Sequence, residues 1–205
     1  MKMIMKKMFV FVVAGLLMNA AAIAGGPGKV KDKSLAVDTK SSTITWGAKK
    51  VTGTHAGTVP VESGTLIVDG DKLKGGSFTA DVKSLVVTDV TDKEMNGKLT
   101  GHLKSDDFFS VEKHPQAKLV ISSVTPKGGD AYDVTGKLTI KGITQEVKFP
   151  ATVKSDASKV TATAKVTVDR TKYDIKFRST NFFENLGDKA IDNDFTLDVN
   201  LVANK

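Results

Sequence analysis

The chain has 205 residues, of which 30 are lysine or arginine and 23 are aspartate or glutamate, and it contains no cysteine. The net charge of +7 rests mainly on lysines that alternate with threonines. This pattern indicates a solvated outer face and argues against a nucleic-acid partner, because such interfaces cluster basic residues with aromatic ones. Without cysteine there is no disulfide framework and no lipid attachment through a thiol, so the apolar core must stabilise the fold.

Residues 1–24 have the pattern of a secretory signal peptide. Three lysines among the first seven residues precede an apolar run at 8–18, and the small residues around Ala24 form an A-x-A cleavage site. The run is shorter than the roughly 20 apolar residues of a membrane span, so we expect no stable membrane insertion. Cleavage near Ala24 leaves 205 − 24 = 181 residues, with 30 − 3 = 27 basic and 23 acidic side chains. We expect this one domain to be periplasmic or secreted.

We expect residues 25–34 to be a flexible segment and residues 35–205 to form the folded domain. Apolar and polar residues alternate with a period of two through most of this domain, as in strands with one buried and one solvated face. Eight strands are predicted, in chain order: TITW (43–46), GTLIVDG (64–70), SFTADV (77–82), AKLVIS (117–122), GKLTIKG (136–142), QEVKFPATV (145–153), VTATAKVTVDR (160–170) and FTLDVNL (195–201).

The spacing of these strands predicts a closed sheet. Turn signals such as Asp69-Gly70-Asp71 separate the strands, and eight strands at short spacing are typical of an antiparallel sandwich or barrel. A barrel is favoured because an open sheet of long strands would leave two unprotected edges. The predicted fold is all-β: an eight-stranded antiparallel barrel with one or two short helices between strands.

The alternation fails at residues 89–113, which contain the run GHLKSDDFFSVEK. This segment predicts one or two short helical turns that cross the barrel between strands. We expect Asp106 and Asp107 in a first helical turn, where acidic residues suit the helix dipole. Phe108 and Phe109 would then point downward as an apolar plug.

The same segment holds residues that could carry chemistry. His102 and His114 are metal-ligand types, but they are twelve residues apart and match no common zinc pattern. Asp106 and Asp107 are adjacent carboxylates that point apart on one element, and no nucleophile, metallopeptidase or phosphate-loop motif accompanies them. We therefore predict no catalytic residues, no metal site, no cofactor and no enzymatic activity.

The inward residues bear on whether the barrel is hollow. Large inward aromatic residues are few, and the strand at 160–168 offers only valine and alanine on its inward side. Thin walls of this kind leave room for a slender apolar ligand. The alternative is that loops and helices fill the interior, and composition alone leaves this choice open.

Several ordered motifs then carry a family resemblance: GHLKSDDFFSVEKHPQAKL, VTGKLTIKGITQEVKFP, VDRTKYDI and NLGDKAIDNDFTLDVNLVA. From about Leu35 to Ala203 the chain resembles the YceI-like proteins, which are secreted or periplasmic lipocalin-like barrels that bind polyisoprenoids. The resemblance implies a long isoprenoid chain, a quinone tail or a polyprenyl phosphate, threaded along the barrel interior, and no catalytic residues. Many members carry Arg-Asp where this chain has Thr100-Gly101, which is typical of a subgroup with its own cavity mouth.

The inward alternation and the resemblance together predict the cavity wall. Its residues are Trp46, Leu66, Phe78, Val82, Leu103, Phe108, Phe109, Leu119, Ile121, Leu138, Ile140, Phe149, Ala164, Val166, Phe177, Phe182, Phe195 and Leu197. Arg170 and Tyr173 are candidate contacts to the ligand head group. For Arg170 the alternative is that it pairs with a neighbouring acid and pins a turn.

These inferences predict a non-catalytic carrier that binds an isoprenoid lipid or quinone for sequestration or transport in the cell envelope. A homodimer is among the assemblies they allow. The alternative is a structural or interaction barrel whose core is filled by its own side chains.

Overall fold

The structure is a computed structural model that describes residues 32–205. The predicted signal peptide at residues 1–24 and most of the segment 25–34 lie outside the described residues, and the first strand begins at Lys33. The strands are β1 (Lys33–Ala36), β2 (Thr43–Lys50), β3 (Gly53–Thr58), β4 (Val61–Asp69), β5 (Lys72–Asp81), β6 (Val86–Val87), β7 (Gln116–Gly128), β8 (Ala131–Ile140), β9 (Ile143–Ser155), β10 (Lys159–Asp169) and β11 (Ile191–Asn204).

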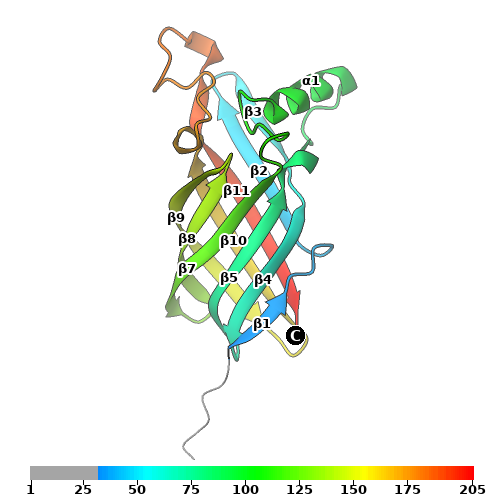
Figure 1. Cartoon of the computed structure of the whole chain (residues 1–205), viewed down its shortest axis with the longest axis vertical. Coiled ribbons are helices and arrows are strands. Elements are labelled where there is room, and N and C mark those ends of the chain that lie inside the picture. The colour runs from blue at the N-terminus through cyan, green and yellow to red at the C-terminus, as the bar shows by residue number, and fades with distance from the viewer. Residues whose placement is uncertain (1–31) are drawn as a thin grey trace, which may run out of the picture.

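All these strands join in one antiparallel sheet that curls around an apolar interior (Figure 1). Their order across the sheet is β1-β4-β5-β7-β8-β9-β10-β11-β2-β3-β6. The predicted all-β antiparallel barrel is confirmed, and each of the eight predicted strands overlaps one strand of eight or more residues. The strand count differs because the short strands β1, β3 and β6 add to these eight.

The short strands close the gap between β2 and β4. β3 pairs with β2 and continues toward β4 through Val59 and Pro60, and Val59 N–H donates to Ile44 O (3.0 Å). At the other end, β1 pairs with β4, and Val37 next to it forms a bridge with Ala203 of β11. Figure 1 shows β1 beside the C-terminal end of β11. These contacts bring the two sides of the sheet together around the interior.

The one α-helix of the described residues, α1 (Lys93–Lys104), lies at the barrel end opposite β1, the same end as the connection that joins β10 to β11 (Figure 1). We call this end the α1 end. Asp92 caps the helix by accepting the Met95 N–H (2.8 Å). The placement of Asp106 and Asp107 in a first helical turn was wrong, because the helix starts at Lys93 and both acids follow its last residue.

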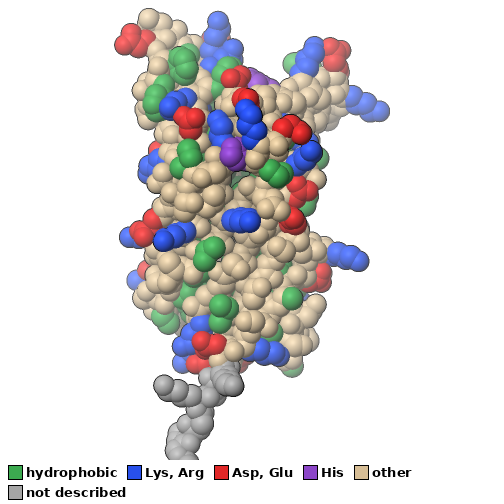
Figure 2. Space-filling view, viewed as in Figure 1, with side chains coloured by type: hydrophobic (Ala, Val, Ile, Leu, Met, Phe, Trp, Pro, Cys, Tyr) green, Lys and Arg blue, Asp and Glu red, His purple; other side chains and the backbone are tan. Residues whose placement is uncertain are grey.

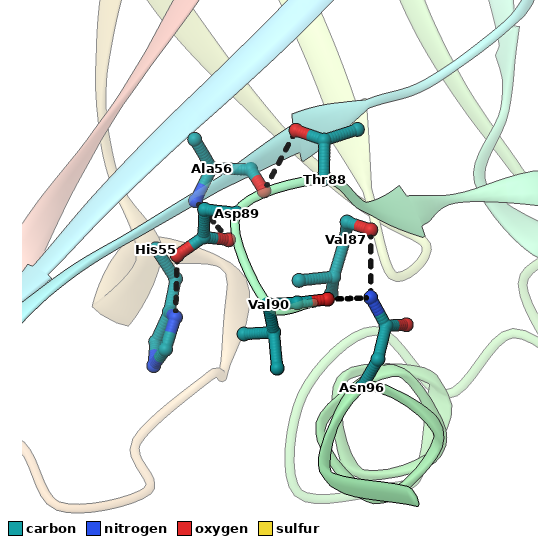
Figure 3. A network of polar contacts seen from close by, with 7 residues as sticks. All are labelled: His55, Ala56, Val87, Thr88, Asp89, Val90 and Asn96. Carbon is teal, nitrogen blue, oxygen red and sulfur yellow. Dashed lines mark hydrogen bonds and ion pairs between the residues drawn. The ribbon is translucent and has the colours of Figure 1, made fainter. Parts of the chain in front are cut away.

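A polar network ties α1 to the sheet (Figure 3). The Asn96 side-chain amide of α1 donates to Val87 O (3.0 Å) and Val90 O (2.9 Å). In the strand next to it, Ala56 N–H donates to Asp89 Oδ1 (3.0 Å), and His55 Nδ1 lies 2.9 Å from Asp89 Oδ2. These bonds satisfy backbone groups of a segment that has little regular pairing, and so fix the helix over the barrel end.

The alternation separates an apolar interior from a charged exterior. The side chains that seal the β1 end are among the most buried, with Leu66, Val160 and Ala203 at most 1% exposed. Figure 2 shows lysine, arginine, aspartate and glutamate side chains interspersed over the outer face of the sheet. Within the part of the chain that the structure describes, no helix has both the length and the apolar character needed to cross a membrane.

Candidate functional site

An apolar cavity with about 200 Å³ of open space lies inside the barrel. Every strand of eight or more residues contributes side chains to its wall, and the segment from α1 to Phe109 closes it at the α1 end. Of the 38 residues on the wall, 32 are apolar, because the inward positions of the alternating strands face it. Such a wall suits a hydrocarbon chain and offers few polar contacts.

The structure places sixteen of the eighteen predicted wall residues on the cavity. They are Trp46, Leu66, Phe78, Val82, Leu103, Phe108, Phe109, Leu119, Ile121, Leu138, Ile140, Phe149, Ala164, Val166, Phe195 and Leu197. Most follow from the period-two alternation of their strands. Phe108 and Phe109 come from the crossing segment, and Phe109 meets Phe195 edge to face with centroids 6.3 Å apart.

Phe177 and Phe182 are not on the cavity wall. β10 ends at Asp169, so the inward phase of that strand does not extend to Phe177. Phe177 instead packs edge to face against His102 (centroids 4.7 Å apart) and lies beside Phe108. Phe182 follows on the same connection and is 49% exposed. Both assignments are corrected, because an irregular connection has no fixed alternation.

Several wall residues were missed by the sequence analysis. Ile44 and Val199 lie on the wall in the same phase as predicted neighbours on their own strands, so the alternation could have found them. Val59, Leu85 and Ile175 lie outside regular strands, and no periodic signal marks them.

Asp106 and Asp107 each pair with a neighbouring side chain on the outer side of the crossing segment. His102 Nε2 lies 3.0 Å from Asp107 Oδ2, and Lys113 Nζ lies 2.8 Å from Asp106 Oδ2. The His114 ring lies next to Gly142, in a different place from His102. Among residues 32–205, no group of three or more histidine, aspartate or glutamate side chains is arranged to hold a metal ion.

Arg170 is a buried cation on the wall, at the start of the connection between β10 and β11. Its guanidinium donates to three backbone carbonyls, those of Ile175 (2.8 Å), Ile191 (3.0 Å) and Asp192 (2.9 Å). Burial lowers the pKa of Arg170, and the charges of Asp169 and Asp192 oppose that change. Arg170 therefore pins the connection to β11, and it does so through carbonyl groups rather than through a paired acid.

Tyr173 lies near Arg170 in the sequence but off the cavity wall. The residue is 1% exposed, and its hydroxyl has no hydrogen-bond partner among the described residues. Burial and the charge of Asp169 raise the pKa of Tyr173 to about 12. Its position gives it no contact with the cavity, in contrast to Arg170.

Trp46 has the other buried polar atom without a partner in residues 32–205. It lies on the cavity wall and is 7% exposed. Around it Val59, Leu85 and Val87 form a small buried cluster beneath α1. Leaving a buried donor unpaired costs about 1–3 kcal/mol. This indole N–H is thus a polar group with unused bonding capacity on an apolar wall.

The single antiparallel sheet and its enclosed apolar cavity define a hollow, lipocalin-like β-barrel. The model of the YceI-like domain matches residues 35–203. The chain belongs to the YceI-like family.

Several bacterial proteins are similar to this chain in sequence or in structure. A UPF0312 protein of Pectobacterium atrosepticum is 50% identical over 50 residues, which cover 24% of this chain and 26% of that protein. The crystal structure of Burkholderia cenocepacia BcnA has a TM-score of 0.62 at 26% identity, covering 82% of this chain and 99% of that one. A polyisoprenoid-binding domain from Saccharophagus degradans, implicated in plant cell wall breakdown, has a TM-score of 0.60 at 12% identity, covering 85% and 99%. The last likeness concerns the fold alone.

Proposed function

We propose that this protein binds a long apolar lipid, a polyisoprenoid such as a quinone or a polyprenyl phosphate, inside its barrel. It sequesters or transports that lipid in the cell envelope, after removal of the signal peptide near Ala24, and catalyses no reaction. The observation that carries this proposal is the enclosed wall, on which 32 of 38 residues are apolar. Membership of the YceI-like family and the fold shared with a polyisoprenoid-binding domain support it.

The apolar wall alone can supply the binding free energy. Burying one methylene group contributes about 0.8 kcal/mol, so about fifteen buried carbons would contribute on the order of 12 kcal/mol before the cost of ordering the chain. A wall of valine, leucine and alanine provides this without a charged anchor.

The open volume sets a condition on binding. About 200 Å³ is less than the roughly 300–1,000 Å³ of most small-molecule sites. We therefore expect a long chain to displace side chains that are only partly buried, among them Phe78 and Phe109. The same small volume favours the alternative, a non-catalytic structural or interaction barrel filled by its own side chains.

Mass spectrometry separates these two functions. The protein is purified from its native envelope beside a mock purification, and organic extracts of both are compared. One isoprenoid per chain supports the carrier. No lipid above the mock, together with no uptake of an added isoprenoid quinone or polyprenyl phosphate, would establish the filled barrel.

A pair of variants ties the lipid to the cavity. Ala164 lies on the wall, and its strand partners Ala151 and Val199 lie there too. Ala164→Trp should reduce the bound lipid to the level of the mock purification, because the ring occupies the space of the chain. Thr167→Trp places the same ring on an exposed position of the same strand and should leave the lipid unchanged. Equal lipid in both variants would mean that the ligand lies elsewhere.

A further inference from the structure

The cavity wall carries a buried hydrogen-bond donor, the indole N–H of Trp46. Trp46 is the one tryptophan of the chain, it lines the cavity, and its Nε1 has no acceptor in the described residues 32–205. Buried polar groups nearly always have a hydrogen-bond partner. A donor that lacks one inside a ligand cavity can be satisfied by an acceptor that the ligand brings.

The ring is held in place by the strand next to it. Trp46 of β2 is paired in register with Gly57 of β3. A Cβ atom at Gly57 would lie 2.7 Å from Cε2 of the indole, the atom bonded to Nε1. The ring therefore packs directly on the backbone of β3, and this contact fixes the direction of its N–H bond.

Apolar side chains pack around the ring. Val59, Leu85 and Val87 are each at most 9% exposed, and the partly buried residues packed against this cluster are also apolar: Ala48, Ala80, Val90, Leu99, Leu103, Phe109 and Leu197. A phosphate group would need several donors and a compensating cation at such a place. One neutral N–H fits one neutral oxygen.

Arg170 does not change this balance. It is the buried cation of the wall, but its guanidinium already donates to the carbonyls of Ile175, Ile191 and Asp192. These bonds hold the connection between β10 and β11. Among residues 32–205, Trp46 is the wall residue with a buried donor that has no partner.

We propose that Trp46 Nε1–H donates a hydrogen bond to an uncharged oxygen of the bound lipid, so that the cavity selects lipids with a carbonyl, ether or hydroxyl oxygen at the α1 end. This inference rests on the proposed function and names its ligand class. Because the N–H is enclosed in this structure, Leu103 and Phe109, which come from the crossing segment rather than from the sheet, shift as the oxygen arrives.

Two probes with the same prenyl tail test the proposal: an isoprenoid quinone and the oxygen-free hydrocarbon. Affinities are measured for the purified wild-type protein and for Trp46→Phe, which keeps an aromatic ring but lacks the donor. Because the smaller ring removes wall contacts, Trp46→Phe should weaken the binding of both probes. We expect it to weaken quinone binding about three- to tenfold more than hydrocarbon binding, the value of one neutral hydrogen bond. Phe78→Leu, which alters the wall without removing a donor, should weaken both probes alike.

The single tryptophan allows a direct observation of the bond. With ¹⁵N-labelled protein, the one indole N–H resonance should move downfield in the quinone complex and stay near its free position in the hydrocarbon complex. Equal loss of both affinities in Trp46→Phe, or the same indole resonance in both complexes, overturns the hydrogen bond. A polyprenyl phosphate that binds more tightly than the quinone and depends on Trp46 overturns the uncharged class. Wild-type protein that binds none of the probes overturns the proposed function itself.

Discussion

Gly57 lies directly under the indole ring of Trp46, its antiparallel partner on the neighbouring strand. A methyl group at position 57 would come within 2.7 Å of two ring carbons and would overlap Val86 O of β6. We expect Gly57→Ala to separate β3 from β6 and to lower the free energy of unfolding by about 1–3 kcal/mol. Urea denaturation at neutral pH measures this loss.

The control for this substitution is another glycine that has open space around it. Gly97 lies on the exposed side of α1, and no atom lies within 4 Å of the position of its missing Cβ. Gly97→Ala should leave stability unchanged or raise it by about 0.5–1 kcal/mol, the difference in helix propensity. Equal effects at both positions would show that Gly57 does not carry a close contact.

We expect substitution of Arg170 to cause a large loss of stability. Arg170→Met removes the donors to three backbone carbonyls, and we expect the free energy of unfolding to fall by about 3 kcal/mol or more. Arg170→Lys keeps the charge but not the planar fork of donors. Its free energy of unfolding should lie between those of the wild type and Arg170→Met. Arg178, the other arginine, is exposed and lies over the Phe177 ring, so Arg178→Met should cost no more than about 1 kcal/mol. Similar losses for both methionine variants would contradict the pinning role of Arg170.

We expect removal of the Tyr173 hydroxyl to stabilise the fold. Its buried hydroxyl has no partner among the described residues, so Tyr173→Phe removes an unsatisfied polar group and should raise the free energy of unfolding by about 1 kcal/mol at pH 7. Tyr132→Phe is the control, because the Tyr132 hydroxyl is not among the buried unpaired groups. A clear loss in Tyr173→Phe would mean that the hydroxyl does have a partner.

The raised pKa of Tyr173 also predicts that the fold loses stability at alkaline pH. Burial and the charge of Asp169 hold that pKa at about 12, against 10.0 for an ordinary tyrosine. Above pH 10 the unfolded chain therefore loses this proton while the folded chain keeps it, so stability falls as pH rises from 10 toward 12. Denaturation midpoints at pH 9 and pH 11 should show a smaller fall in Tyr173→Phe than in the wild type. An equal fall in the midpoints of the two proteins would show that the pKa of Tyr173 is not raised by folding.

The lowered pKa of Asp89 predicts a loss of stability at acidic pH. Burial on its own would raise the pKa of Asp89, but hydrogen bonds from the Ala56 N–H and from His55 outweigh it and hold the pKa below its ordinary value of 3.8. The carboxylate thus stabilises the fold above pH 3.8, and this contribution is lost as pH falls through the lowered pKa. Asp89→Asn should be less stable by no more than about 1 kcal/mol at pH 7, and should converge with the wild type below pH 3.

The control for Asp89→Asn is the same substitution at Asp188, an exposed residue of the short 3-10 helix Gly187–Lys189. Asp188→Asn changes the same group, and its stability should follow the wild type at both pH values. If Asp89→Asn differs from the wild type equally at pH 7 and pH 3, the loss comes from packing and not from the charge.

Local patterns predicted most of the sheet, and their limits are visible at particular residues. Period-two alternation located the eight long strands and the inward phase that puts Ala164 and Val166 on the cavity wall. It did not locate β3, which reads GTHAGT and pairs with β2 and β6. It also misplaced Phe177, where β10 had already ended. The dipole argument put Asp106 and Asp107 in a first helical turn, but the acid in the first turn of α1 is Glu94.

The order of residue types alone identifies the amphipathic strands, an apolar core without disulfides and the resemblance to the YceI-like family. These properties depend on residue types at fixed short spacing, so they can be read without knowing any contact. Folding in three dimensions establishes three further features: closure through β1 and β3, the carbonyl partners of Arg170 and, among residues 32–205, the unpaired N–H of Trp46. Packing, and not local pattern, decides which polar groups find a partner.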